Sequence, residues 1–286
     1  MEPNADRTLL KLGVNVLLPC LIADTVLGNS LLAKASDLAF PPLLGFGLIV
    51  GSMGIVALML APLRLPHETH SAGIITAGIQ NFGYLVIPLV ESLYDKETLG
   101  VLFMHNLGVD IAMWSVGCWV LVKAKRGDSW KHLLSAPGLA VIGSGGLNLL
   151  HFNQWLPAFF RKSLHMLGQT AIPLAILLTG ATMFDQMRQT TQEPFKYKPV
   201  TLALLARMAV LPMLVLAIAR WFPMPAALRN ILVIQAAMPS AMMPVVLCRM
   251  HGADSKFSVQ IILASTALGF FTIPLWIRFG STFVAG

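Results

Sequence analysis

The sequence predicts an all-α, polytopic membrane protein built from inverted repeats, with two broken helices that cross within the membrane. The first observation is composition: 56% of the 286 residues are hydrophobic and only 12% are charged, whereas a soluble domain carries about 25% charged residues. The second is a span-length apolar run, 231–250, that two prolines interrupt. The third is that its landmarks recur earlier in the chain at a constant offset.

The apolar runs predict nine membrane spans, since each approaches or exceeds the ~20 residues that cross a bilayer as a helix. The connections between them are too short for a soluble domain. The expected spans are 9–32, 40–62, 71–93, 98–122, 133–150, 164–184, 199–221, 227–250 and 257–279.

The eighth span carries the strongest single feature. Pro239 and Pro244 lie near its middle, and each removes a backbone donor from the helix. Lipid offers no replacement partner, so a broken helix must be buried in protein or line a wet cavity. Such a break is typical of transporter binding sites. The alternative is a simple proline kink, which membrane helices tolerate.

A second copy of the pattern favours the break over the kink. Offsets between 154 and 156 residues relate four pairs: Gln80 with Gln235, Pro88 with Pro244, Asn15 with Gln169, and Pro19 with Pro173. The chain therefore reads as a duplication, with a first repeat of four spans in 1–125 and a second of five in 126–286.

The repeats are expected to be inverted. Spans one to four pair with spans six to nine, and the odd separation of five spans makes the second copy enter from the opposite face. The fifth span has no partner, which predicts that a first helix has been lost or that the sequence starts late.

The basic residues predict the orientation. Twelve lysines and arginines fall on the side of the N-terminus and seven on the other side, with Arg207 left inside a span. The richer side is expected to be cytoplasmic, so the N-terminus lies inside and the C-terminus outside. The net charge of +7 thus reflects topology, and no nucleic-acid partner is expected.

These motifs together resemble the auxin efflux carrier family across nearly the whole chain. The resemblance rests on Gln235-Ala-Ala-Met-Pro-Ser-Ala-Met-Met-Pro244, Gly252-Ala-Asp254, Thr272-Ile-Pro-Leu-Trp276, Asn81-Phe-Gly-Tyr-Leu-Val-Ile-Pro88, Arg207 with Pro212, and Asn15-Val-Leu-Leu-Pro19. It implies ten helices in two inverted five-helix repeats, as in bile-acid symporters and sodium–proton antiporters. Plant members export auxin, and bacterial members carry small carboxylates such as malate or malonate. The long central loop of plant members is absent, because 123–132 occupies its place, which favours a bacterial-type member in a bacterial cytoplasmic membrane.

Asn81 is the first candidate for substrate binding, because the resemblance places this asparagine in the site. A half-helix N-terminus carries partial positive charge and favours an anion, and the Asn81 amide would add a donor to a carboxylate. The alternative is an asparagine that only caps the helix.

The other expected site residues have plainer alternatives. Gln80, Gln235 and Ser240 either bind substrate or satisfy backbone groups that the breaks free. Gly83 is expected to permit close approach at the crossing. Met238 is expected to line the crossing as adaptable apolar surface, with core packing as the alternative.

Four ionisable residues in or near spans are candidates for coupling, since such side chains are costly in a membrane and are usually functional. Asp110 and Arg207 are expected to form a static ion pair, with a proton-carrying Asp110 as the alternative. His105 either joins a proton relay or is a packed polar residue. The role of Asp24 stays open.

The expected function is a secondary carrier that moves a small organic anion across the membrane by alternating access. The alternatives are a sodium-coupled organic-anion symporter of the bile-acid type and a non-transporting sensor or assembly subunit. No enzyme, cofactor or metal site is expected, and His67-Glu-Thr-His70 lacks the spacing of a zinc protease. The expected partners are the anion, the bilayer and a second copy of the chain.

Overall fold

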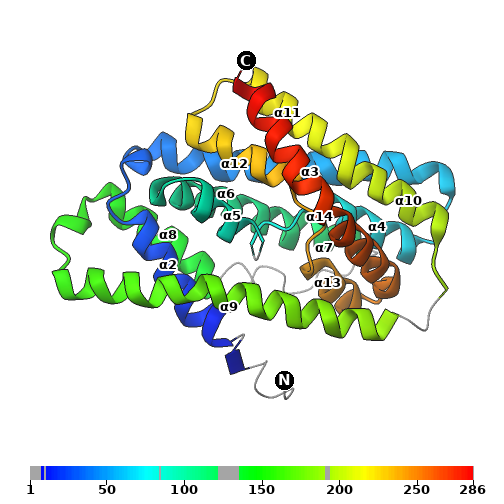
Figure 1. Ribbon diagram of the computed structural model, residues 1–286, viewed down its shortest axis with the longest axis horizontal. Coiled ribbons are helices and arrows are strands. Elements are labelled where there is room, and N and C mark those ends of the chain that lie inside the picture. Colours follow the sequence, from blue (N-terminus) through cyan, green and yellow to red (C-terminus); the bar gives the residue numbers. More distant parts are fainter. Residues whose placement is uncertain (1–7, 10, 84, 122–134, 191–193, 286) are drawn as a thin grey trace.

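The computed structural model describes residues 8–9, 11–83, 85–121, 135–190 and 194–285, and these residues form a bundle of helices (Figure 1). No strand occurs among them apart from one isolated bridge. The all-α polytopic fold class is confirmed. The basic loop at 123–132 and the start of the expected fifth span lie outside the described residues.

The helices follow one another with short connections. Those labelled η are 3-10 or π segments, and most of the π segments continue directly into an α-helix. In chain order they are η1 (Gly13–Leu17), α2 (Leu18–Val26), η2 (Ser30–Leu32), α3 (Ala35–Leu60), η3 (Ala61–Leu63), α4 (His67–Gly78), α5 (Val86–Leu93), α6 (Lys96–Ala112), η4 (Met113–Gly117), α7 (Cys118–Leu121), α8 (Ala136–Leu149), η6 (Phe152–Gln154), α9 (Ala158–Thr190), α10 (Tyr197–Leu205), η7 (Ala206–Val210), α11 (Leu211–Trp221), α12 (Ala226–Ala237), α13 (Met243–His251) and α14 (Ser255–Ala285).

Four helices of the described chain are long and apolar enough to cross a membrane unaided, at Ala35–Leu63, Lys96–Leu121, Tyr197–Trp221 and Ser255–Val284. The predicted third and eighth spans are each divided into two helices, α4 with α5 and α12 with α13. The predicted first span is shorter than expected, because its helix ends at Val26 and a 3-10 turn follows.

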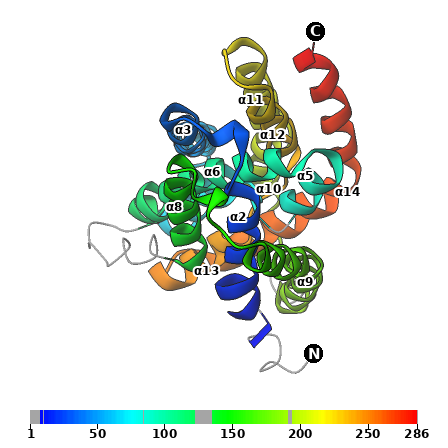
Figure 2. The same cartoon turned by 90° about the vertical axis from the view of Figure 1, so that its left-hand side faces the viewer.

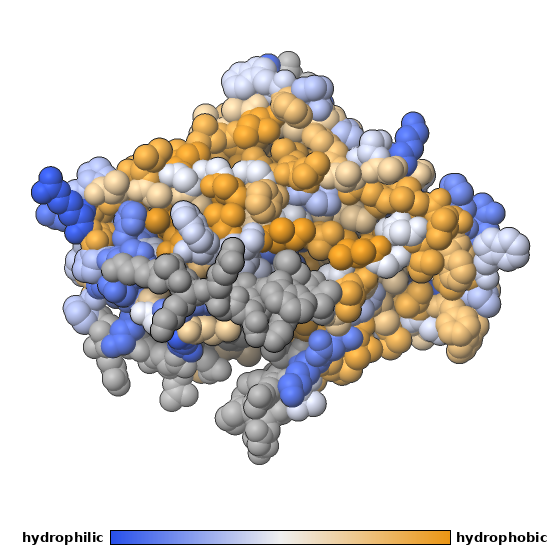
Figure 3. All heavy atoms as spheres, turned by 180° about the vertical axis from the view of Figure 1, so that it is seen from behind, coloured by the Kyte–Doolittle hydropathy of each residue, from blue (hydrophilic) through white to orange (hydrophobic). Residues whose placement is uncertain are grey.

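The helix arrangement puts the breaks at the centre of the bundle. In Figure 1, α5 and α12 lie on the left of the crossing and α4 and α13 on the right. Seen from the end (Figure 2), α6 occupies the middle, and it packs against α2, α3, α5, α8 and α12. The surface in Figure 3 is mostly apolar, with hydrophilic residues gathered towards its left and right ends, as expected of a protein that crosses a bilayer along that direction.

Glycine sets the distance between α3 and α6. A Cβ atom on Gly108 would overlap the carbonyl oxygen of Pro42, and one on Gly45 would overlap that of His105. Small residues of this kind let membrane helices approach closely. The pair positions α6, and with it the polar side chains that α6 presents to the crossing.

We therefore expect Gly108→Ala to lower the melting temperature of the purified protein, because the contact is with backbone and the helices must move apart. Overpacking of this kind costs about 1–3 kcal/mol. The matched control is Gly51→Ala on α3, where a Cβ meets no atom within 4 Å and alanine is the better helix former. Equal melting temperatures for both variants would contradict the close packing.

Candidate functional site

The two broken helices meet and exchange backbone hydrogen bonds. Among the described residues, the break after α4 covers 79–83 and 85, and the break after α12 covers 238–242. Gln80 and Ser240 form an antiparallel bridge. Two backbone bonds flank it: the Asn81 N–H donates to the Pro239 carbonyl at 2.7 Å, and the Ala241 N–H donates to the Ile79 carbonyl at 2.9 Å.

Side-chain amides reinforce the crossing. The Gln80 Nε2 donates to Gln235 Oε1 at 2.8 Å, and Gln235 Nε2 donates to Asn106 Oδ1 at 3.0 Å. The Asn106 Nδ2 then donates to the carbonyl of Phe82 at 2.6 Å. Asn106 was not among the predicted site residues; the only sequence signal for it was its place one helical turn before Asp110.

Asn81 lies in the first break, five residues before α5 begins, and is 7% exposed. Its Oδ1 accepts the Leu85 N–H at 3.4 Å, which is a long hydrogen bond, and α5 has no side-chain cap. The Asn81 side chain makes no other hydrogen bond within the described residues. Asn81 therefore makes one weak contact through its oxygen and keeps its amide N–H groups available.

Ser240 also has one polar group that is hydrogen-bonded and one that is not. Its backbone N–H donates to Ser265 Oγ at 3.2 Å, while its own hydroxyl is buried without a partner in the described structure. Met238 is fully buried and packs in the hydrophobic core with Ile234 and Ala237. It belongs to the core rather than to a cavity wall.

Two expectations about the breaks are wrong. Gly83 does not permit close approach, because a Cβ there meets no atom within 4 Å. Pro88 and Pro244 do not sit at the breaks but in the first turns of α5 and α13, where a missing backbone N–H costs little. Of the predicted crossover prolines only Pro239 lies in a break, and the first break forms without proline.

The expected ion pair between Asp110 and Arg207 is also wrong. The ion pairs found in the described chain join Asp24 to Lys96 and His165, and Asp254 to Lys196. Asp110 lies on α6, whereas Arg207 lies on η7, whose main neighbours outside its own span are α3, α4 and α14. The two charged residues therefore lie on segments with different main neighbours and form no ion pair.

The remaining coupling candidates lie apart from each other. His105 is fully buried on α6, and neither ring nitrogen has a partner among the described residues. The packed-residue alternative therefore fits it better than a relay. Asp24 binds Lys96 at 2.7 Å and His165 at 3.0 Å. It lines a separate pocket of about 340 Å³ with Asn153 and Arg161.

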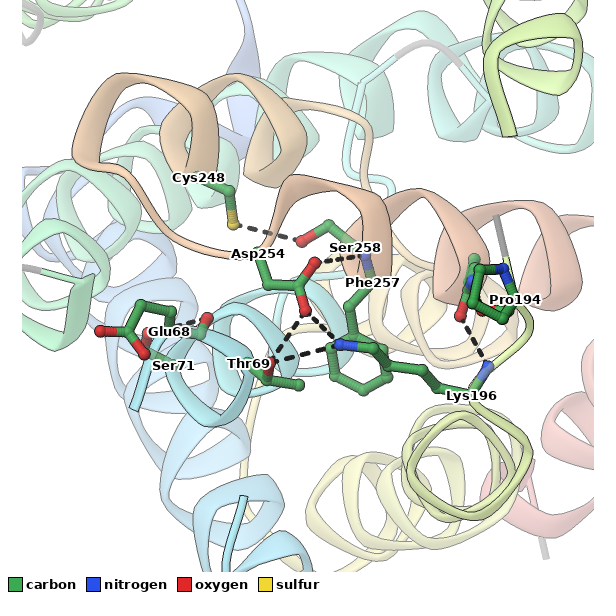
Figure 4. A network of polar contacts seen from close by, with 10 residues as sticks. Glu68, Thr69, Ser71, Pro194, Lys196, Cys248, Asp254, Phe257 and Ser258 are labelled. Atoms are coloured by element: carbon green, nitrogen blue, oxygen red, sulfur yellow. Dashed lines mark hydrogen bonds and ion pairs between the residues drawn. The ribbon is translucent and has the colours of Figure 1, made fainter. Parts of the chain in front are cut away.

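A second polar cluster ties together α4, α14 and the start of α10 (Figure 4). Asp254 accepts Lys196 Nζ at 2.5 Å, the Thr69 hydroxyl at 2.8 Å and the Phe257 N–H at 3.0 Å. Lys196 also lies over the Phe257 ring at 5.6 Å. Burial alone would raise the pKa of Asp254, but the hydrogen bonds from Lys196, the Phe257 N–H and Thr69 outweigh it and hold that pKa below its usual value.

A membrane bundle whose two interrupted helices cross and present unpaired polar groups defines the class of membrane transporters. The chain belongs to the family described as "Membrane transport protein", which matches residues 1–132 and 120–277. The resemblance to auxin efflux carriers is thereby confirmed.

Two archaeal relatives are described as transporters. An uncharacterized transporter of Methanocaldococcus jannaschii is 24% identical over 232 residues, which cover 78% of this chain and 73% of the relative. An uncharacterized transporter of Methanothermobacter thermautotrophicus is 26% identical over 274 residues, which cover 94% of this chain and 87% of the relative.

Asp254→Asn should lower the melting temperature at pH 7. Asparagine keeps the shape of the aspartate side chain but loses the negative charge that Lys196 neutralises. Because the pKa of Asp254 is lower in the folded protein, its charge stabilises the fold at pH values above the unfolded-state pKa of about 3.9. This stabilisation is lost as the pH falls through the folded-state pKa. The difference from the wild type should therefore shrink below about pH 4. The control is Glu91→Gln, an exposed carboxylate. A pH-independent difference would exclude the charge as the cause.

Proposed function

We propose that this transporter is a secondary carrier for a small organic anion, which binds where the two broken helices cross. The observation that carries the proposal is the pairing of two breaks, which two backbone hydrogen bonds join while the Asn81 amide and the Ser240 hydroxyl are left without acceptors in the described structure. These are donor groups, and an anion supplies what they lack.

The helix ends favour the same ligand. The N-termini of α5 and α13 both begin at the crossing, and helix N-termini attract negative charge. The C-termini of α4 and α12 end there too, but Ile79 and Pro239 direct carbonyls to the opposite break. Two helix N-termini together with the Asn81 amide support a carboxylate more than a cation.

We further propose that the repeats 1–125 and 126–286 are related by inversion and expose the site alternately to the two sides. Gln80 and Gln235 support this idea, because they are 155 residues apart, lie near the point where the first half of each broken helix ends and hydrogen-bond to each other. Contact between equivalent residues is what a two-fold axis through the crossing would produce. A homodimer is a further part of the proposal.

Asp110 is the proposed proton carrier. It lies one turn beyond Asn106 on α6, so the two side chains share a helix face, and Asn106 belongs to the crossing network. The Asp110 carboxylate has no hydrogen bond or ion pair within the described residues. Sodium coupling is the competing mechanism.

The experiment that tests the function is transport in proteoliposomes, preceded by a thermal-shift screen of carboxylates on the purified protein. A ligand that binds only the folded state raises the melting temperature. Uptake driven by a proton gradient supports the proposal, uptake that requires sodium favours the symporter, and the absence of binding and uptake for every carboxylate contradicts it.

Asn81→Ala should weaken binding of the stabilising carboxylate by roughly ten- to a hundred-fold, since a hydrogen bond to a charged group contributes about 1.5–3 kcal/mol. The melting temperature without ligand should change little, because the backbone bonds of the crossing remain. Affinity and melting temperature are measured on the same preparation.

Asn148→Ala is the matched control. Asn148 is a buried asparagine that holds the turn after α2 through bonds of 2.7, 3.1 and 3.0 Å to Gly28, Asn29 and Leu32. It should lose stability and keep affinity. Unchanged binding by Asn81→Ala, or a loss that merely follows unfolding, would remove Asn81 from the site.

The topology proposal places the N-terminus in the cytoplasm and the C-terminus outside, in a cytoplasmic membrane, because basic residues prefer the cytoplasmic side. Reporter fusions at both ends should therefore report opposite sides. Two ends on one side would contradict the odd number of spans and the inverted relation of the repeats.

A further inference from the structure

Arg207 is the least expected buried residue in the described structure. It is 1% exposed and heads the group of the largest fully buried side chains. Its Nε and Nη1 atoms have no hydrogen-bond acceptor, and none of the ion pairs of the described chain includes it. Guanidinium groups stay protonated in proteins, so a full charge is enclosed here without a counter-charge.

The backbone around Arg207 departs from a regular α-helix. Arg207 lies in the π-helical segment η7, and Pro212 follows in the first turn of α11. Proline lacks the N–H that the carbonyl four residues earlier, at Met208, would accept in an α-helix. The indole of Trp276 on α14 donates to that carbonyl at 2.9 Å instead. A π segment kept open in this way is frequent at functional sites.

Arg207 borders the crossing itself. A cavity of about 10 Å³ is lined by Arg207, Ser52, Gln80 and Gln235, with Leu48, Val215 and Leu232 completing the wall. Its polar lining therefore combines a guanidinium, a hydroxyl and the two amides that join the breaks. A space of that size accommodates one water-sized group, so the walls must separate before a larger ligand enters.

We propose that Arg207 is the counter-charge for the transported substrate, so that the anionic group of the substrate pairs with this guanidinium beside the Gln80–Gln235 bridge. The inference rests on the proposed function and narrows it to substrates that carry a full negative charge on a planar oxyanion such as a carboxylate. A buried unpaired charge is costly, and native structures rarely leave such donors unsatisfied without a reason. A guanidinium matches a carboxylate with two parallel hydrogen bonds.

A structural role for Arg207 makes the opposite prediction. If the arginine stabilised the empty fold, its removal would lower the melting temperature. If Arg207 is a counter-charge, its unpaired charge destabilises the protein without substrate. Arg207→Gln keeps polar donors but removes the charge, so it should leave the melting temperature of the substrate-free protein unchanged or raise it. Arg207→Lys keeps the charge and loses the planar fork, so it should retain part of the binding.

The test measures binding by thermal shift with malonate, malate and indole-3-acetate, each beside its neutral amide. Wild-type protein should bind an acid and not its amide, and Arg207→Gln should lose at least ten-fold in affinity for that acid. The control is Arg220→Gln. Arg220 lies in α11 of the same span, and its guanidinium is occupied by the Phe283 carbonyl and ring.

Each outcome decides between the roles. Normal acid binding by Arg207→Gln, equal binding of acid and amide by the wild type, or a lower melting temperature of the empty Arg207→Gln protein would overturn the counter-charge role. Normal acid binding by that variant would still leave the carrier function intact. If the wild type binds no carboxylate, the proposed function fails, whatever Arg207 does.

Discussion

The reciprocal backbone pairing of the two breaks is the constraint on which the rest of the structure depends. Within the hydrocarbon core of a bilayer, an unpaired peptide group has no water to hydrogen-bond with, so an interrupted helix is stable where protein supplies the missing partner. Here each interruption supplies the other: Asn81 donates to Pro239, and Ala241 donates to Ile79. The second interruption thus supplies part of the backbone pairing that the first one needs.

This pairing also separates the polar groups that maintain the fold from those that do not. The chain of bonds from Gln80 through Gln235 and Asn106 to Phe82 satisfies its members internally. Next to it, the Ser240 hydroxyl and the Arg207 guanidinium are buried without partners. A fold selected for stability alone would replace such groups with apolar ones. Their presence beside the crossing is the physical basis for the substrate site proposed there.

The fold class, the two broken spans and the place of Gln80 and Gln235 at the crossing could be predicted from the sequence. Composition identifies the membrane spans, and a constant offset shows which positions in the two repeats correspond. The sequence was insufficient wherever rotation about a helix axis decides a contact. Asp110 and Arg207 were placed at similar depth, yet they face different helices. Pro212 has no N–H to donate to the Met208 carbonyl, and the indole of Trp276, which lies 68 residues after Met208, donates to that carbonyl instead. No local sequence pattern indicates such a distant partner. Pro88 was misassigned because a proline both breaks helices and starts them, and only the backbone shows which of the two occurs.

The same bonds limit how the protein can move. The bridge between the breaks and the amide chain beside it connect the two interrupted helices to α6 through buried contacts. The ties at the ends of the bundle are of another kind, because the Asp254–Lys196 pair and the Asp24–Lys96 pair each include a half-exposed lysine. Exposed ion pairs contribute little and exchange readily with water. The centre of the bundle is therefore held by buried bonds and its ends by weaker exposed pairs, a distribution that fits the proposed alternating exposure of a central site.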